Sequence, residues 1–347
     1  MIELFSDTMT RPTPAMRRAM AEAEVADEQR REDPTTNRLQ QMVAELLGRE
    51  AAVFLPSGAM CNAVAIKTHT VPGEAILCDR LAHIYRSEFG GAATLSGVTT
   101  EGIAGERGLF TKHQLEATLA NYGPYSPVPR VLCVEQTHNF GGGAVWPLMQ
   151  LRDVCAVAHA RGMKTHMDGA RLLNASVATG VPARDYAETF DSVWIDFSKG
   201  LGCPVGAVLA GSRDFIDRAW RWKHCFGGAM RQSGILAAAG IYALEHHVAR
   251  LADDHANARL LANGLSAIRG VHLDPPIVQT NILFFDVTGA GMSNEQFRQR
   301  MLERGVRFSG IGHRVRAVTH LDVTREQIEQ AVEIAGEVLA PGSGKNN

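Results

Sequence analysis

The sequence predicts an α/β protein in which helices cover a mostly parallel sheet, followed by a smaller α+β domain. Three observations lead to this fold class. Short apolar runs alternate with helical patterns between residues 51 and 223, which is typical of a parallel sheet. A long helical stretch at 229–267 ends the alternation, and beyond it strands and helices are mixed. The expected division is an arm at 1–14, a large domain at 15–246 and a small domain at 247–347.

The first fifty residues predict an arm and two helices. Residues 1–14 contain two prolines, which disfavour a continuous helix. Helical patterns follow at 15–24 and at 36–47, and the second has its apolar residues on one face. Gly48 is suited to end that helix, because glycine readily adopts the left-handed conformation found after a helix.

Elements of the two domains follow from the period of the apolar residues. In the large domain we expect strands at 51–55, 74–78, 93–98, 130–136, 164–168, 192–197 and 204–211, and helices from 59, after 83, and near 112–121, 148–161 and 213–223. In the small domain we expect strands at 281–287 and 314–320, helices at 293–304 and 324–339, and a frayed tail at 341–347.

Composition excludes several classes of protein. The formal charge of −2 over 347 residues gives no basic surface for nucleic acid. No uninterrupted apolar run approaches ~20 residues, so no membrane span is expected. The beginning of the chain does not resemble a signal peptide. Six cysteines are scattered without the CxxC spacing, which favours reduced thiols in the cytoplasm. We expect no metal site.

The stretch at 164–206 is predicted to deliver an acid and an amine to one pocket. KTHMD ends in Asp168, and the apolar run SVWIDF ends just before Ser198 and Lys199. Desolvation at such a strand end would lower the pKa of a lysine and leave it nucleophilic. A lysine that forms a Schiff base and an acid beside a ring nitrogen are what pyridoxal phosphate requires. A buried Lys–Asp ion pair that only holds the sheet is the alternative.

Several motifs together resemble the L-threonine aldolase family. They are SDTMTRP (6–12), DGAR (168–171), SKGLG (198–202), PVG (204–206), GAMRQSGILAAAGIYAL (228–244) and VTHLD (318–322). The resemblance covers nearly the whole chain, and the order of the motifs is specific. It implies a fold type I pyridoxal-phosphate enzyme, related to the aromatic amino acid β-eliminating lyases. The implied reaction is cleavage of L-threonine, L-allo-threonine or a related β-hydroxy-α-amino acid to glycine and an aldehyde.

The resemblance also implies roles for residues around the cofactor. Lys199 would bind pyridoxal phosphate covalently, and Asp168 would contact its ring nitrogen. Ser57, Gly58 and Ala59 match the phosphate-binding turn, although the family usually has a hydroxyl where Ala59 stands. His83 would stack on the ring and accept the proton of the substrate hydroxyl. Glu88 would orient a neighbouring side chain.

Three further residues have open alternatives. His138, beside Asn139, would bind the substrate hydroxyl, although a polar loop would explain this segment equally well. Arg171 would reach the ring oxygen, or else pair at the surface with Asp185 or Asp191. Arg231 would reach the phosphate of a neighbouring subunit, or else form an ion pair at the interface.

The substrate carboxylate is expected to bind Arg316, because a guanidinium can bind a carboxylate through two hydrogen bonds. Ser6 is expected beside it, and Arg314 is the rival. The chain departs from the family pattern at Arg30–Arg31 and at His224. Arg30 or Arg31 could favour an anionic substrate such as 3-hydroxyaspartate. The alternative is that both arginines lie in a solvated loop.

Two rival functions remain. The same scaffold supports β-elimination, racemisation or transamination. A nucleotide-binding protein that uses PSGAM or NFGGG is a different class, but neither stretch has the GxGxxG spacing. The family's shared active sites imply at least a homodimer, and a homotetramer is the expectation.

Overall fold

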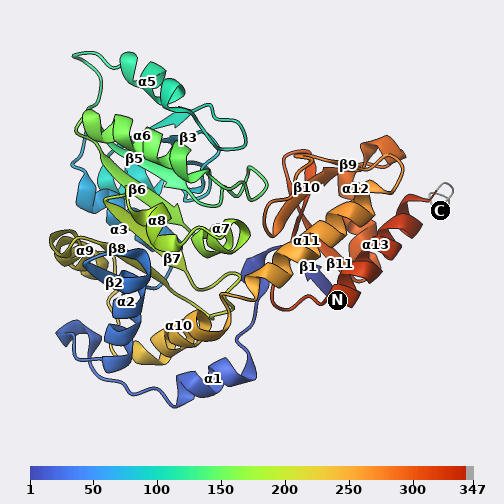
Figure 1. Cartoon of the computed structure of the whole chain (residues 1–347), viewed down its shortest axis with the longest axis horizontal. Helices are drawn as coiled ribbons and strands as arrows, with labels where there is room; N and C mark the ends of the chain where they lie inside the picture. The colour runs from blue at the N-terminus through green and yellow to red at the C-terminus, as the bar shows by residue number, and fades with distance from the viewer. Residues whose placement is uncertain (341–347) are drawn as a thin grey trace.

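The computed structural model describes residues 1–340, and its centre is a seven-stranded sheet (Figure 1). The strand order is β2-β8-β7-β6-β5-β3-β4. Only β8 runs antiparallel to its two neighbours, β7 and β2, so the prediction of a mostly parallel sheet is confirmed. The strands are β2 (Ala51–Leu55), β3 (Ala75–Asp79), β4 (Thr99–Ile103), β5 (Pro129–Glu135), β6 (Lys164–Gly169), β7 (Ser192–Asp196) and β8 (Ala207–Gly211).

Helices cover both faces of this sheet because its strands are apolar on both sides. Val53 and Leu55 of β2 pack with α3 and α9, whereas Phe54 between them packs in the core that contains α2. The helices are α1 (Pro14–Ala21), α2 (Pro34–Leu47), α3 (Gly58–His69), α4 (His83–Arg86), α5 (Lys112–Ala120), α6 (Leu148–Ala160), α7 (Leu172–Thr179), α8 (Ala183–Ala187), α9 (Arg213–Cys225) and α10 (Gly234–His246).

A second sheet of five strands forms the smaller lobe, in the order β1-β11-β12-β10-β9. Its strand β1 comes from the N-terminal arm and pairs in parallel with β11, so the blue strand lies among orange and red elements in Figure 1. The elements of this lobe are β1 (Ile2–Leu4), α11 (Leu251–Ser266), β9 (His272–Leu273), β10 (Ile282–Asp286), α12 (Asn294–Glu303), β11 (Val306–Ile311), β12 (Arg314–Val318) and α13 (Arg325–Leu339). The domain limits at residues 14 and 246 stay a prediction. The structure adds that the arm pairs with the smaller lobe through β1 and β11.

Two element predictions were wrong. The strand expected at 93–98 is a π-helical turn, Ala92–Ser96, and the neighbouring strand β4 begins at Thr99. Gly97 has a positive φ of 69° at the end of that turn, which breaks the apolar run that suggested a strand. The helical stretch at 229–267 is two helices, α10 and α11. The tail expected at 341–347 lies outside the described residues.

The start of α2 is fixed to α10 by the buried carboxylate of Asp33. Its Oδ1 accepts a hydrogen bond from the backbone of Thr36 at 2.8 Å, as in other helix N-caps. Its Oδ2 accepts from the backbone N–H groups of Ala26 and Gly234, each at 3.1 Å. One side chain therefore satisfies donors from three segments of the chain.

We expect Asp33→Ala to lower the free energy of unfolding by about 2–4 kcal/mol, because two buried N–H groups and one partly buried N–H group lose their acceptor. Urea denaturation followed by circular dichroism measures this loss. Thr324→Ala is the control, because Thr324 is an exposed N-cap on α13 and should cost only about 1 kcal/mol. Equal losses for the two variants would contradict the role given to Asp33.

Candidate active site

A cavity of about 350 Å³ lies at the carboxyl ends of β6 and β7, next to the start of α3. Ligand sites of open α/β sheets are found at this edge. The cavity brings together most of the predicted site residues, namely Ser6, Ser57, Gly58, Ala59, His83, Asp168, Arg171, Lys199 and Arg316. These residues come from both lobes and from the N-terminal arm.

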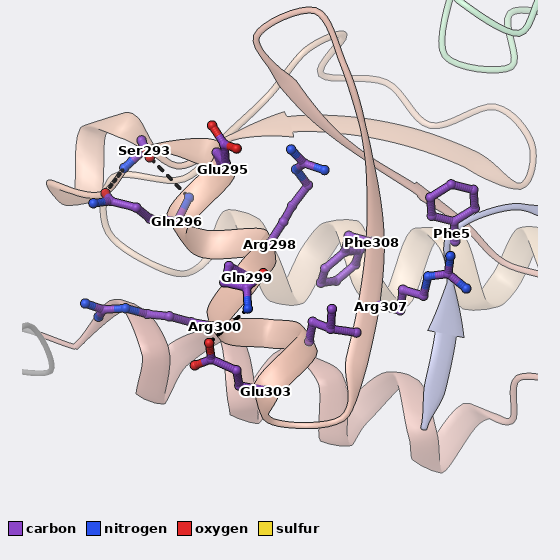
Figure 2. A pocket seen from close by; sticks show the side chains of 11 residues that line it. Phe5, Ser293, Glu295, Gln296, Arg298, Gln299, Arg300, Glu303, Arg307 and Phe308 are labelled. Carbon is purple, nitrogen blue, oxygen red and sulfur yellow. Dashed lines mark hydrogen bonds between the residues drawn. The ribbon is translucent and has the colours of Figure 1, made fainter.

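A larger groove of about 900 Å³ runs along α12 and β11, with Phe5 at one end and Ser293 and Gln296 at the other (Figure 2). Among residues 1–340, its lining includes Arg298 and Arg307 but no lysine and no histidine. It therefore offers neither an amine for covalent chemistry nor an imidazole for proton transfer. We assign the chemistry to the smaller cavity.

Lys199 lies just beyond β7, and its amine pairs with Asp196 Oδ2 at 2.9 Å. The same amine lies 5.7 Å from the centre of the Trp194 ring. Thr10 donates to the backbone carbonyl of Lys199 at 2.8 Å, which fixes the turn after the strand. The ion pair that the sequence left open thus exists, but its acid is Asp196. Asp168 remains free to contact a ligand.

Asp168 is a buried carboxylate near the end of β6. It accepts hydrogen bonds from the side chain of Asn62 at 2.9 Å and from the backbone of Ala170 at 3.1 Å. Burial raises its pKa to about 6, with a further contribution from the charge of Glu135 and opposition from His83 and Lys199. Such a group favours a cationic partner, as a protonated pyridine nitrogen would be.

His83 begins α4 with its backbone N–H donated to Glu135 at 2.6 Å. Its Nδ1 lies 2.9 Å from Glu88 Oε1, in agreement with the predicted orienting role of Glu88. Burial lowers the pKa of His83, but the hydrogen bond to Glu88 and the charges of Asp168 and Glu135 outweigh burial and raise it. The ring is thus held at the cavity wall.

Arg171 pairs with Asp7 of the arm, not with Asp185 or Asp191. Its Nε and one terminal nitrogen donate to the two carboxylate oxygens at 2.7 and 2.6 Å, and both side chains are buried. Although burial raises the pKa of Asp7, Arg171 holds it well below the ordinary range. The pair anchors the arm against the cavity.

Arg316 fits an incoming carboxylate. It donates to the backbone carbonyl of Phe5 at 3.1 Å and to Asn139 Oδ1 at 2.8 Å, but its Nε is buried without a hydrogen-bond partner in residues 1–340. Burial, and next the charge of Arg171, lower its pKa to about 10. Its rival Arg314 instead binds Asp274 and does not line the cavity.

The start of α3 is shaped to receive a phosphate. Ser57 caps the helix by accepting from the backbone of Met60 at 3.2 Å, and the N-terminus of a helix favours anions. Gly58 lies under the indole of Trp194, where a Cβ would approach a ring atom to 2.2 Å. Glycine alone allows the turn to lie this close to the sheet.

Three predicted site residues do not line the cavity. His138 is buried, with its Nε2 3.5 Å from Asp79, and Gly141 donates to its Nδ1 at 3.2 Å. Arg231 is exposed and pairs with Asp27 at 2.9 Å, and Arg30 is exposed. Their roles stay predictions.

The two departures from the family pattern also lie on the surface. Arg31 pairs with Asp217 at 2.9 Å, as the solvated-loop alternative requires. His224 is exposed, and it follows the buried Lys223, which pairs with Glu28.

Several residues of the site were missed. Asn62, Glu135, Asp196 and Asp7 hold the groups described above, and the ion pair of Lys223 was also not foreseen. Asn62 had a visible signal, because it is a polar residue inside the otherwise apolar run AMCNAVAI of α3. Asp7, Glu135 and the pair of Lys223 with Glu28 depend on contacts between distant segments, whereas Asp196 lies only three residues before Lys199.

Comparisons with known proteins identify the family of this chain. Residues 3–288 match the family model described as beta-eliminating lyase. The low specificity L-threonine aldolase of Escherichia coli K12 is 42% identical over 95% of this chain and 97% of its own. Low-specificity L-threonine aldolase 1 of Arabidopsis thaliana is 38% identical over 94% and 93%. This chain belongs to the threonine aldolase family. These aldolases are pyridoxal-phosphate-dependent lyases.

The fold of this aldolase-family chain is also found in a solved structure. The threonine aldolase of Leishmania major superposes with a TM-score of 0.85 at 21% identity, over 98% of this chain and all of that one (100%). The fold is therefore that of fold type I pyridoxal-phosphate enzymes. No helix within residues 1–340 has the length and apolar character needed to span a membrane.

We expect Asp168→Asn to stabilise the cofactor-free protein relative to wild type as the pH rises. The folded pKa of Asp168, about 6, lies above the ordinary aspartate value of 3.8, so ionisation costs stability as the pH rises from about 4 to about 6. Melting temperatures of both proteins between pH 4 and pH 8 measure the difference. A difference that does not change with pH would contradict the raised pKa.

Proposed function

We propose that this chain cleaves L-threonine, L-allo-threonine or a related β-hydroxy-α-amino acid to glycine and an aldehyde with pyridoxal phosphate. The observation that carries the proposal is the cavity itself. Within the described part of the chain it combines the amine of Lys199, a buried acid that forms no ion pair, an imidazole, and a guanidinium with an unpaired N–H. Relatives that match over nearly their full length are named low-specificity L-threonine aldolases.

The residues present suit the cofactor. Lys199 would bind it covalently, Asp168 would keep its ring nitrogen protonated, and Arg171 would lie near its ring oxygen. Ser57, Gly58 and Ala59 would hold its phosphate, with one hydrogen bond fewer than a hydroxyl at position 59 would give. When bound, the cofactor supplies an electron sink for the carbon–carbon bond that breaks.

Binding and proton transfer fall to other side chains. Arg316, with Ser6 beside it, would hold the α-carboxylate and so fix the rotation of the substrate. His83 would accept the proton of the β-hydroxyl, and Glu88 would stabilise the resulting imidazolium. His138 is retained as a candidate for hydroxyl binding, and Arg30 as a candidate for substrate choice.

β-Elimination is the second candidate, because the matching family model is described as beta-eliminating lyase. It requires a leaving group on the β-carbon and yields pyruvate and ammonia. Racemisation uses the same cofactor and would leave the carbon skeleton intact. Product analysis separates all three reactions.

We also propose a homotetramer, with a homodimer as the minimum. Support comes from a groove of about 640 Å³ that shares Ala59 and Glu88 with the cavity. Exposed apolar side chains lie beside it, and Phe89 is fully exposed. A partner could cover this surface and bring Arg231 to the phosphate.

A cytoplasmic location is supported by six cysteines that are all free thiols.

The first test compares wild type with Lys199→Ala on L-threonine, L-allo-threonine, phenylserine and 3-hydroxyaspartate. We expect glycine and an aldehyde from wild type, and a rate at least about 1000-fold lower from the variant, because the covalent anchor is lost. Amino acid analysis and an aldehyde assay measure the products. Pyruvate in place of glycine would reassign the reaction to elimination.

The Arg30 hypothesis has its own test. If Arg30 faces the substrate side chain in the assembled enzyme, Arg30→Ala should lower kcat/KM for 3-hydroxyaspartate relative to threonine. A charge contact of about 1–2 kcal/mol corresponds to roughly 5-fold to 30-fold. Arg38→Ala, at another exposed arginine, is the control. An unchanged ratio would leave Arg30 as a solvated loop residue.

A further inference from the structure

A buried line of polar side chains extends from Asp168 away from the cavity, between α3 and the sheet. It consists of Asn62 on α3, His166 on β6, Ser192 on β7 and His69 at the end of α3. Asn62, His166 and Ser192 are each at most 1% exposed. None of the four lines the cavity, and Asn62 reaches it only through its hydrogen bonds to Asp168 and Glu88.

The hydrogen bonds of Asn62 fix which end of its side-chain amide is the oxygen and which is the nitrogen. Its amide nitrogen donates to Asp168 Oδ2 at 2.9 Å and to Glu88 Oε1 at 2.7 Å. Its oxygen accepts from the indole N–H of Trp194 at 2.7 Å. Ionised carboxylates only accept and an indole only donates, so the reversed amide would place like groups against each other.

This orientation determines the proton position on His166. The Nε2 of His166 lies 3.0 Å from the oxygen of Asn62, so Nε2 must carry the hydrogen. Burial lowers the pKa of His166 to about 3, and the ring is therefore neutral. Its Nδ1 then accepts from Ser192, whose hydroxyl oxygen lies 2.8 Å away and is also 2.8 Å from Nε2 of His69. His69, Ser192, His166 and Asn62 therefore each donate a hydrogen bond to the next group in the line, which ends at Asp168.

Asn62 also connects the two groups that would act on the ring. The oxygen of Glu88 that accepts from Asn62 is the one that lies 2.9 Å from Nδ1 of His83. One amide thus holds both the acid at the ring nitrogen and the carboxylate behind the proton acceptor. Displacing it would disturb both at once.

We propose that Asn62 is a positioning residue for the aldol cleavage, and that His166, hydrogen-bonded to Ser192, keeps its amide in the orientation that serves Asp168 and Glu88. The reaction step rests on the proposed function, whereas the hydrogen-bond line itself does not. Its first test uses wild type, Asn62→Ala and Thr68→Val. Thr68 lies on the same helix, is buried, and donates only to the backbone of Val64 at 2.6 Å.

We expect Asn62→Ala to bind pyridoxal phosphate about 10-fold to 100-fold more weakly, because the loss of a buried charge-assisted hydrogen bond has this size. The pH dependence of the visible absorption of the bound cofactor should shift as well. For threonine, kcat should fall with little change in KM, because Arg316 is untouched. Thr68→Val should match wild type in all three measurements.

The second test needs neither cofactor nor a variant. In ¹⁵N-histidine NMR of the cofactor-free wild type, we expect His166 to remain neutral with its hydrogen on Nε2 from pH 5 to pH 8. The titratable and charged groups near this line are Asp168 and Glu88 at one end, and Asp191, Lys164 and Arg218 beside His69 at the other. A hydrogen on Nδ1, or a doubly protonated ring, would overturn the proposal even if Asn62→Ala does not fold.

The outcomes separate this inference from the proposed function. If wild type binds no pyridoxal phosphate or releases no glycine, the proposed function fails and the NMR result alone decides the hydrogen-bond line. If wild type is active but Asn62→Ala binds the cofactor as tightly as Thr68→Val, the positioning role fails and the function stands.

Discussion

The structure depends on burying several carboxylates at one edge of the sheet. Each needs donors, because an unpaired buried charge is costly. Glu135 receives the backbone N–H groups of His83 and Asn139, Asp196 receives Lys199, and Asp7 receives Arg171. Asp168 differs from Asp196 and Asp7, because its donors are neutral amides. Glu135 also accepts from neutral amides, but these are backbone groups, so that it holds the start of α4 and the loop at Asn139 in place. We therefore infer that Asp168 is the acid kept for a ligand.

Arg316, which also lines the cavity, is a positive charge with neutral hydrogen-bond partners. Arg316 donates to two neutral oxygens and forms no ion pair within the described residues. Within residues 1–340 the cavity therefore has one acid and one guanidinium that form no ion pair, at separate positions. A ligand with a protonated ring nitrogen at one end and a carboxylate at the other complements both. The combination of cofactor and amino acid has these two groups, so the electrostatics agree with the family.

Sequence reasoning recovered what depends on local pattern. The strand β2 was predicted at its observed limits, and Lys199 and Asp168 were predicted to reach one pocket because each follows or ends a predicted strand. Contacts between distant segments were missed, since nothing near Arg171 in the chain points to Asp7. The pairing of Lys199 with Asp196 was also missed, although Asp196 lies only three residues before it, because the order of residues does not show which carboxylate the amine faces. The π-helical turn at 92–96 was missed because its residues are as apolar as those of a strand.

The arm links the two lobes in a way that bears on how the chain acquires its site. Strand β1 pairs with β11, and Arg307 binds Glu3 from 304 positions further along the chain. A few residues after Glu3, Asp7 closes on Arg171. Contacts of such separation form slowly, because long loops must close first. Arg316 lies on β12 of the smaller lobe, whereas Lys199 and Asp168 follow or end strands of the larger sheet, so the cavity is complete only when both lobes have folded beside each other.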